Sequence, residues 1–123
     1  MLNQTILVGR IAHEPELRET ETGKKVTNVT LAVPRSYKNV EGEYETDFIS
    51  CVLWQGIAEN TVEYCHTGDL VGVKGHLQAR QYETEENKYH IMEVIAEKIT
   101  FLSSKKEKNE KEKKSKKQEK AEQ

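Results

Sequence analysis

The sequence predicts an all-β fold for most of its length, and three observations support this prediction. Up to Leu102, apolar and polar residues mostly alternate with a period of two, as in half-buried strands. Turn-forming residues recur every ten to fifteen positions, which is typical of strands joined in one antiparallel barrel or sandwich. Only the segment from Ile57 to Cys65 has apolar residues at helical spacing.

The first half of the predicted sheet has three strands. The first runs from about Gln4 to Ala12, and Gly9 in its middle indicates a bulge or a tight bend. The second covers about Lys25 to Arg35. A polar hairpin loop over Asn39 to Thr46 then leads into the third strand, at about Asp47 to Gln55.

A short helix is predicted next, over Ile57 to Cys65, with Gly68 placed to cap its C-terminal end. The fourth strand spans about Leu70 to Tyr82 and the fifth about Lys88 to Leu102. Five strands with one helix between the third and the fourth are the layout of the OB-fold, a five-stranded, partly open Greek-key barrel that binds oligonucleotides or oligosaccharides. We therefore predict one OB-fold domain over residues 1–102.

The last residues differ in composition from this domain. Ser103 to Gln123 contains nine lysines and five glutamates, and Ala121 is its one apolar residue, so we predict a disordered tail. The tail carries a charge of +4 and residues 1–102 carry −6, since the whole chain carries −2. Such a Lys/Glu-rich segment is usually a solvated tail. The competing hypothesis is that it contacts phosphates and compensates for the acidic domain.

Membrane proteins and disulfide-rich secreted proteins are excluded by the sequence. No uncharged apolar stretch approaches the ~20 residues of a membrane span, and no leader segment opens the chain, so we expect a cytoplasmic protein with no membrane partner. Cys51 and Cys65 have no CxxC spacing, which favours two reduced, buried thiols.

An enzyme is the first alternative function. Nucleophilic catalysis would need Cys51 or Cys65 beside a positioned histidine, and a metal site would need converging ligands. The available ligands are Cys51, Cys65, His13, His66, His76 and His90. Because both thiols fall on apolar faces, we predict no catalytic residue, no metal and no cofactor.

Strand parity identifies a candidate binding face. In the third predicted strand, one face carries Ile49, Cys51 and Leu53, which would fill the barrel interior. The opposite face carries Phe48 and Trp54, and a face that only meets water rarely needs two such rings. This second face is therefore a candidate surface for a ligand.

The fourth predicted strand has a related pattern. Its inward face is predicted to carry Val71, Val73, Gly75, Leu77 and Ala79. Its outward face carries Lys74, His76, Gln78, Arg80 and Tyr82. Aromatic rings stack on any unpaired base and nearby cations neutralise phosphate, so this combination suits single-stranded nucleic acid. The predicted stacking residues are Tyr37, Phe48, Trp54 and Tyr82.

Exposed rings on strands also have a structural explanation, because they pair across strands or fill subunit interfaces. An OB-fold adaptor of the replication machinery that binds protein through its aromatic face is therefore the second alternative function. The other tyrosines, Tyr44, Tyr64 and Tyr89, are predicted to lie in a loop, against the helix, and in the core or an interface, respectively.

Several motifs occur in the order found in one family. They are Met-Leu-Asn at the start, Ile-Leu-Val-Gly-Arg at 6–10, Pro-Glu-Leu-Arg at 15–18, Asp-Phe-Ile-Ser-Cys-Val-Leu-Trp at 47–54 and Gly-His-Leu-Gln-Ala-Arg at 75–80. With these motifs, residues 1–102 resemble the bacterial single-stranded DNA-binding proteins and their phage and plasmid relatives.

The resemblance implies a homotetramer of OB-fold domains, associated with the nucleoid, that binds single-stranded DNA during DNA replication, recombination or repair. The family's stacking aromatics fall on the same four residues that strand parity selects. Basic residues that relatives present to the DNA backbone fall on or near Arg10, Arg35 and Arg80. Together with Lys74, these are the predicted phosphate contacts.

The C-terminus departs from the family pattern. Replicative members end in a short acidic tip that recruits repair and replication enzymes, whereas this chain ends Lys-Ala-Glu-Gln. This difference predicts an accessory, phage or plasmid-type member that does not recruit enzymes through such a tip.

Overall fold

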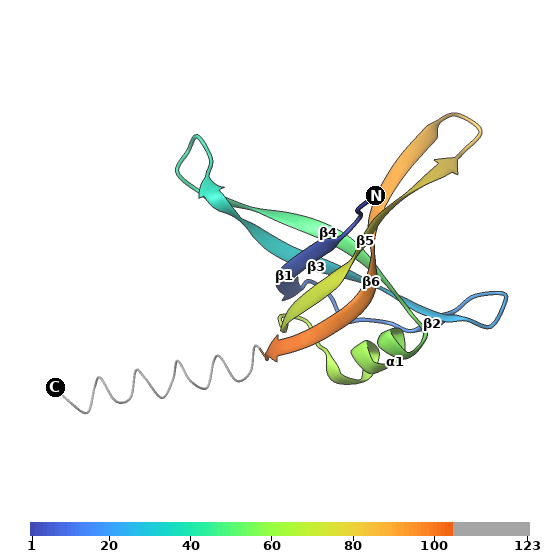
Figure 1. The fold of residues 1–123 in the computed structure, drawn as a ribbon. Helices are drawn as coiled ribbons and strands as arrows, with labels where there is room; N and C mark the ends of the chain where they lie inside the picture. The colour runs from blue at the N-terminus through green and yellow to red at the C-terminus, as the bar shows by residue number, and fades with distance from the viewer. Residues whose placement is uncertain (105–123) are drawn as a thin grey trace, which may run out of the picture.

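The computed structural model describes residues 1–104, which form six strands and one helix (Figure 1). In chain order the elements are β1 (Thr5–Ile11), β2 (Arg18–Glu19), β3 (Lys25–Lys38), β4 (Tyr44–Trp54), α1 (Gln55–Tyr64), β5 (Leu70–Glu83) and β6 (Lys88–Ser103). The five predicted strands and the predicted helix all form, with bounds within three residues of those expected. The two-residue strand β2 was not predicted, because Arg18–Glu19 is too short to show a period.

The strands close into a barrel. Their order is β1-β5-β6-β4-β3-β2, and β1 also pairs with β3. Two of the contacts are short: β1 pairs with β3 at two positions, and the parallel pairing of β4 with β6 also involves two. The arrangement confirms the predicted OB-fold, a partly open Greek-key barrel with one helix between the third and fourth long strands.

The core follows the predicted parity. The inward residues of β4 pack with those of the neighbouring strands and with Ala58 of α1. Both cysteines are buried free thiols. Burial raises the pKa of Cys51 to about 11, so its thiol stays protonated and unreactive at neutral pH. This environment matches a core residue, as the sequence predicts.

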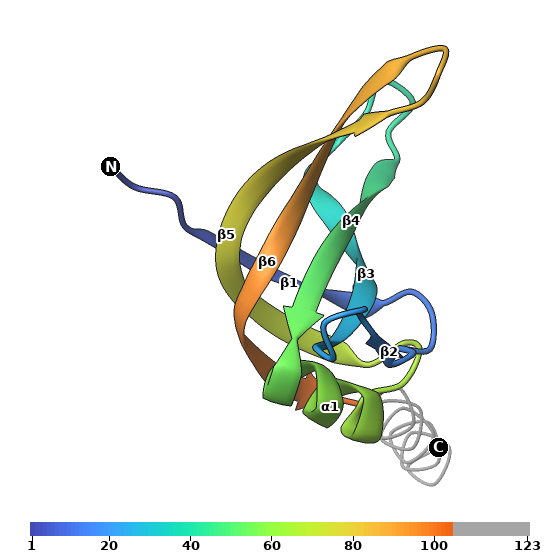
Figure 2. The same ribbon diagram turned by 90° about the vertical axis from the view of Figure 1, so that its right-hand side faces the viewer.

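The β3–β4 and β5–β6 hairpins extend beyond the barrel, away from the end that carries α1 (Figures 1 and 2). The inward face of β5 is therefore covered only in its first half: Val71 and Val73 are buried, whereas Leu77 and Ala79 are exposed. The predicted burial of Leu77 and Ala79 was wrong, because the alternating pattern continues past the point where the barrel has an interior.

The chain segment before β1 is fixed along β5. The side-chain amide of Asn3 donates to the Leu77 carbonyl oxygen at 2.8 Å and accepts from the Leu77 N–H at 2.9 Å. Asn3 thus occupies the position of a paired strand residue after the last β1–β5 pair, Thr5 with Gly75. Met1 itself is fully exposed, and the N-terminus points away from the barrel (Figure 2).

Gly68 has a different role from the predicted helix cap. Helix α1 ends at Tyr64, and the Cys65 N–H closes its last turn on the Thr61 carbonyl oxygen. Gly68 lies in the following turn, with φ of +90°, and its N–H donates to the Ile11 carbonyl oxygen at 2.7 Å. Left-handed backbone at this point favours glycine, which here joins the turn before β5 to β1.

Two sequence predictions are only partly covered by the structure. The predicted tail, residues 103–123, lies outside the described residues from position 105 onward, and β6 includes Ser103. Within residues 1–104, no helix is long and apolar enough to cross a membrane.

Candidate nucleic-acid interface

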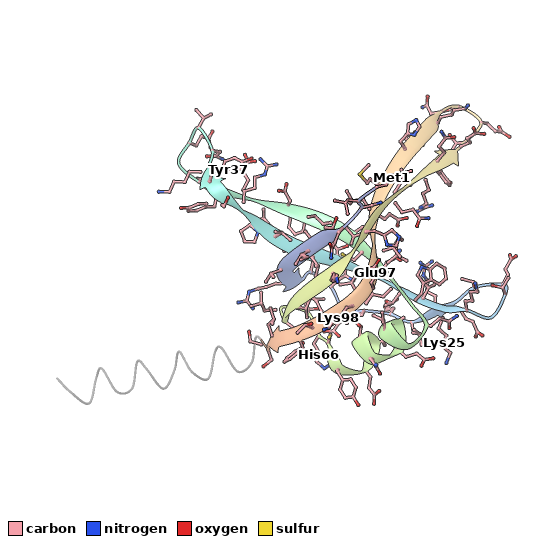
Figure 3. The ribbon with its side chains drawn as sticks, viewed as in Figure 1. Met1, Lys25, Tyr37, His66, Glu97 and Lys98 are labelled. Carbon is pink, nitrogen blue, oxygen red and sulfur yellow. The ribbon has the colours of Figure 1, made fainter. Side chains whose placement is uncertain are left out.

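The four predicted stacking residues are all exposed. The exposed fractions are 64% for Tyr37, 67% for Phe48, 39% for Trp54 and 51% for Tyr82. Phe48 and Trp54 lie on the same face of β4, and Tyr37 lies near the far end of β3 (Figure 3). These rings are placed on the face of the barrel and on both extended hairpins, where an extended ligand has access to them.

Two further tyrosines join this set. Tyr89 faces Tyr82 across the β5–β6 hairpin, with the ring centroids 6.4 Å apart, and Tyr89 is half exposed. Tyr44 is exposed near the start of β4, with the Lys38 ammonium 5.7 Å from its ring centroid, within the range of a cation–π contact. The cross-strand register that pairs Tyr89 with Tyr82 is the signal that would have identified it.

Tyr44, which was predicted to lie in a loop, is instead the first residue of β4, and the prediction for Tyr64 was also wrong. Tyr64, expected to pack against the helix, is exposed on α1. Helix α1, which carries Tyr64, lies at the end of the barrel opposite the two hairpin tips (Figure 2). Tyr64 is therefore a useful reference residue, an exposed ring away from the hairpin tips.

A hollow of about 380 Å³ lies beside Trp54. Its lining residues come from β2 to β6 and adjoining turns: Arg18, Thr20, Val26, Asn28, Val52, Trp54, Gln78, Arg80, Glu93 and Ile95. Val52 and Ile95 are paired in the short parallel contact between β4 and β6. The hollow therefore combines an aromatic ring, aliphatic side chains and hydrogen-bonding groups, as ligand sites commonly do.

Arg80, which lines this hollow, forms an ion pair with Glu93. Its Nε donates to Oε1 of Glu93 at 2.7 Å, and the Glu93 side chain is 11% exposed while that of Arg80 is 53% exposed. The terminal nitrogens of Arg80 make no other hydrogen bond with the described residues. The carboxylate thus holds one edge of the guanidinium and compensates its charge.

Arg35 is bound by two carboxylates, whereas Arg80 is bound by one. It makes two-pronged hydrogen bonds to Asp47 through Nε and Nη2, and its Nη1 donates to Glu45 at 2.6 Å. The Arg35 guanidinium holds the pKa of the Asp47 carboxyl below its usual value, and Asp47 in turn raises the pKa of Arg35. Asp47 and Glu45 share the face of β4 opposite Phe48, so this cluster is not on the face of the Trp54 hollow.

The other two predicted phosphate contacts lie elsewhere on the barrel. Arg10 is on β1, and its Nη1 donates to the Gly68 carbonyl oxygen at 2.9 Å. Arg10 pairs with Ala32 of β3, and Ala32 pairs with Phe48 of β4, so Arg10 and Phe48 are two strands apart in the same row of the sheet. Lys74 is on β5 between Ile6 and Lys98. The structure therefore brings Arg80 to the Trp54 hollow, and it places Lys74 outside the lining of that hollow.

A second hollow, of about 420 Å³, adjoins the first. It is lined by His13, Glu14, Glu16, Arg18 and Asn28, and so shares Arg18 and Asn28 with the Trp54 hollow. Glu14 accepts a hydrogen bond from the Thr67 N–H at 3.0 Å and contacts His66 at 3.2 Å, and these contacts lower the pKa of its carboxyl. The two hollows together cross the outer face of β3.

The chemistry of this surface is that of binding. In residues 1–104, no three histidine, cysteine, aspartate or glutamate side chains converge on a metal position. The rings present flat faces for stacking, the hollows supply amide and charged groups, and the carboxylates near the cations keep the surface from being strongly basic. Such a surface suits unstacked bases better than the closed stack of a duplex.

Comparison with known proteins gives a consistent result. Residues 2–102 match the family described as "Single-strand binding protein family". The chain is 49% identical over 106 residues to "Single-stranded DNA-binding protein B" of Bacillus subtilis, an alignment that covers 85% of this chain and 94% of the relative. It is 48% identical over 106 residues to "Single-stranded DNA-binding protein 1" of Staphylococcus aureus, covering 85% of this chain and 68% of the relative.

The match to other relatives is less complete. With the Lactiplantibacillus plantarum "Single-stranded DNA-binding protein", 45% identity over 108 residues covers 87% of this chain but 54% of the relative. Among solved structures, "Plasmodium falciparum SSB complex with ssDNA" is similar, with a TM-score of 0.75 and 28% identity; the alignment covers 84% of this chain and 96% of the other. The family match, the identity to several members and the shared OB-fold lead to one conclusion: the chain belongs to the single-strand binding protein family.

Proposed function

We propose that this protein binds single-stranded DNA without strong sequence preference and protects it during DNA replication, recombination or repair. The observation that supports this most is the set of exposed rings at Tyr37, Phe48, Trp54 and Tyr82, which lie on one barrel face and two extended hairpins. Stacking on such rings tolerates every base, because each base has a flat face. The names of the relatives point to the same ligand.

Single-strand selectivity tests this proposal. Filter binding at ~0.1 M salt should retain labelled oligo-dT on the protein, and an excess of unlabelled oligo-dT should displace it. The same mass of blunt duplex DNA should compete at least tenfold less well, because its bases are already stacked. Equal competition by the duplex would contradict the proposed function.

We further propose that the protein acts as a homotetramer in the bacterial cytoplasm, where the nucleoid lies. From Thr5 to Val8, β1 has a described strand partner on one side only, so its other edge is open for pairing. Ile6 and Val8 are exposed on its outer face, and the side chains of Val8 and Leu102 both lie beside Gly72. An open edge flanked by apolar side chains favours association with a second copy of the chain.

Ile6→Lys tests this assembly. The variant should shift the protein from tetramers to smaller species in native mass spectrometry, because it places a charge in the expected interface. Val40→Lys is the matched control, since Val40 is fully exposed in the β3–β4 loop and should tolerate the charge. If both variants and the parent chain have the same mass distribution, the β1 interface is refuted.

The alternative is an adaptor of the replication machinery that binds protein through the same aromatic face. The exposed rings alone are compatible with it. A chain that bound neither oligo-dT nor any other single strand, while remaining folded, would favour this alternative.

A further inference from the structure

We propose that Arg18, which the sequence did not identify as a DNA contact, holds a phosphate of the strand whose base stacks on Trp54. This inference rests on the proposed function and identifies a contact within that same surface. Arg18 ends the Pro-Glu-Leu-Arg segment at 15–18, and its one structural role in residues 1–104 is a short backbone pairing with β3.

The register places Arg18 beside the stacking ring. Arg18 on β2 pairs with Val26 on β3, and Val26 pairs with Trp54 at the end of β4. Paired residues in neighbouring strands point to the same face, about 4.8 Å apart per strand. Arg18 and Trp54 therefore flank the buried Val26 on one face, two strands apart.

The hollows give Arg18 a central position. It lines both the hollow beside Trp54 and the hollow beside His13, so it stands where the two adjoin. A strand that leaves the Trp54 ring and crosses the outer face of β3 must pass this side chain. Its sugar–phosphate backbone is then within reach of a long, flexible cation.

Arg18 differs from two other candidate cations in that no carboxylate of residues 1–104 pairs with its charge. Arg80 is paired with Glu93, and Arg35 is paired with Asp47 and Glu45. Arg18 makes no ion pair and no side-chain hydrogen bond with any described residue, and its side chain is exposed. Two arginines of residues 1–104 line the hollows, Arg18 and Arg80. Of these two, Arg18 is the one whose side-chain donors are all available for phosphate.

Arg18→Gln tests the contact, with Lys24→Gln as the matched control. Lys24 is on the same β2–β3 hairpin and is exposed, but lines neither hollow, so its loss removes the same charge without removing the contact. The affinity of each full-length variant for labelled oligo-dT is measured by fluorescence anisotropy at several salt concentrations. Thermal melting followed by circular dichroism confirms that each variant is folded.

Arg18→Gln should raise the Kd about tenfold, since a charge-assisted hydrogen bond to phosphate is lost. It should also reduce the slope of log affinity against log salt by about 0.7, the value for one phosphate on a single strand. Lys24→Gln should change the Kd less than twofold and leave the slope unchanged. Arg18→Lys should keep the slope of the parent chain, because the charge remains.

Two results would overturn the inference in distinguishable ways. If the parent chain binds oligo-dT but Arg18→Gln and Lys24→Gln have the same affinity and slope, Arg18 is not a phosphate contact and the proposed function stands. If the parent chain binds no oligo-dT at any salt concentration, the proposed function fails and the Arg18 contact fails with it.

Discussion

Replacing Trp54 by alanine is expected to weaken oligo-dT binding by about 5- to 150-fold, since one base stacked on an aromatic ring contributes roughly 1–3 kcal/mol. Trp54 is the ring that borders the 380 Å³ hollow, and it is 39% exposed, so part of its surface is free to receive a base. Phe48→Ala should have a smaller effect in the same direction, because Phe48 lies on the same face of β4 outside the lining of that hollow.

The control for this prediction is Tyr64→Ala. Tyr64 is an exposed ring on α1, at the end of the barrel away from the hairpins, so its removal should change oligo-dT affinity less than twofold. Affinities from filter binding are compared with melting curves from circular dichroism. The stacking account is contradicted if folded Trp54→Ala binds as tightly as the parent chain, or if Tyr64→Ala weakens binding equally.

Gly75→Ala is expected to lower the free energy of unfolding by about 3 kcal/mol or more, at the upper end of what overpacking costs. A Cβ atom at Gly75 would clash with the backbone carbonyl oxygen of Ile95. β5 cannot give way easily, because Gly75 is paired with Ala96 of β6 on one side and with Thr5 of β1 on the other. The added methyl group would therefore separate two strands that close the barrel.

Gly72→Ala in the same strand provides the comparison. Its Cβ would meet its nearest neighbours at 3.9 Å, an ordinary van der Waals distance, so the free energy of unfolding should change by less than about 1 kcal/mol. Urea unfolding of both variants measures the difference. Equal stabilities for the two variants would show that β6 can move away from Gly75 at little cost, contrary to the packing described above.

Much of this fold was predictable because strand parity is a local property. Phe48 and Trp54 were assigned to an outward face from alternation alone, and the structure exposes both. Alternation does not say where the barrel ends, so Leu77 was predicted to be buried although it lies on the extended part of a hairpin. The role of Gly68 depends on its contact with Ile11, which is distant in sequence.

The charged part of the site was less predictable, for a physical reason. Arg35 is a cation in the sequence, but the cross-strand register brings Asp47 and Glu45 to it, so its charge is compensated within the fold. Arg18, in contrast, could not be identified as a site residue from the sequence, because its two-residue strand shows no pattern. Only the pairing of β2 with β3 places Arg18 beside Trp54. Charge availability depends on partners that parity cannot identify.

A titration of intrinsic tryptophan fluorescence with oligo-dT tests the central claim most directly, because Trp54 is the only tryptophan in the 123 residues. If bases stack on this ring, emission should be strongly quenched as oligo-dT of several lengths is added, and higher salt should reverse part of the quenching. A blunt duplex at the same concentration should barely change the emission. Emission that oligo-dT leaves unaffected at low salt would contradict the proposal that this surface binds single-stranded DNA by stacking.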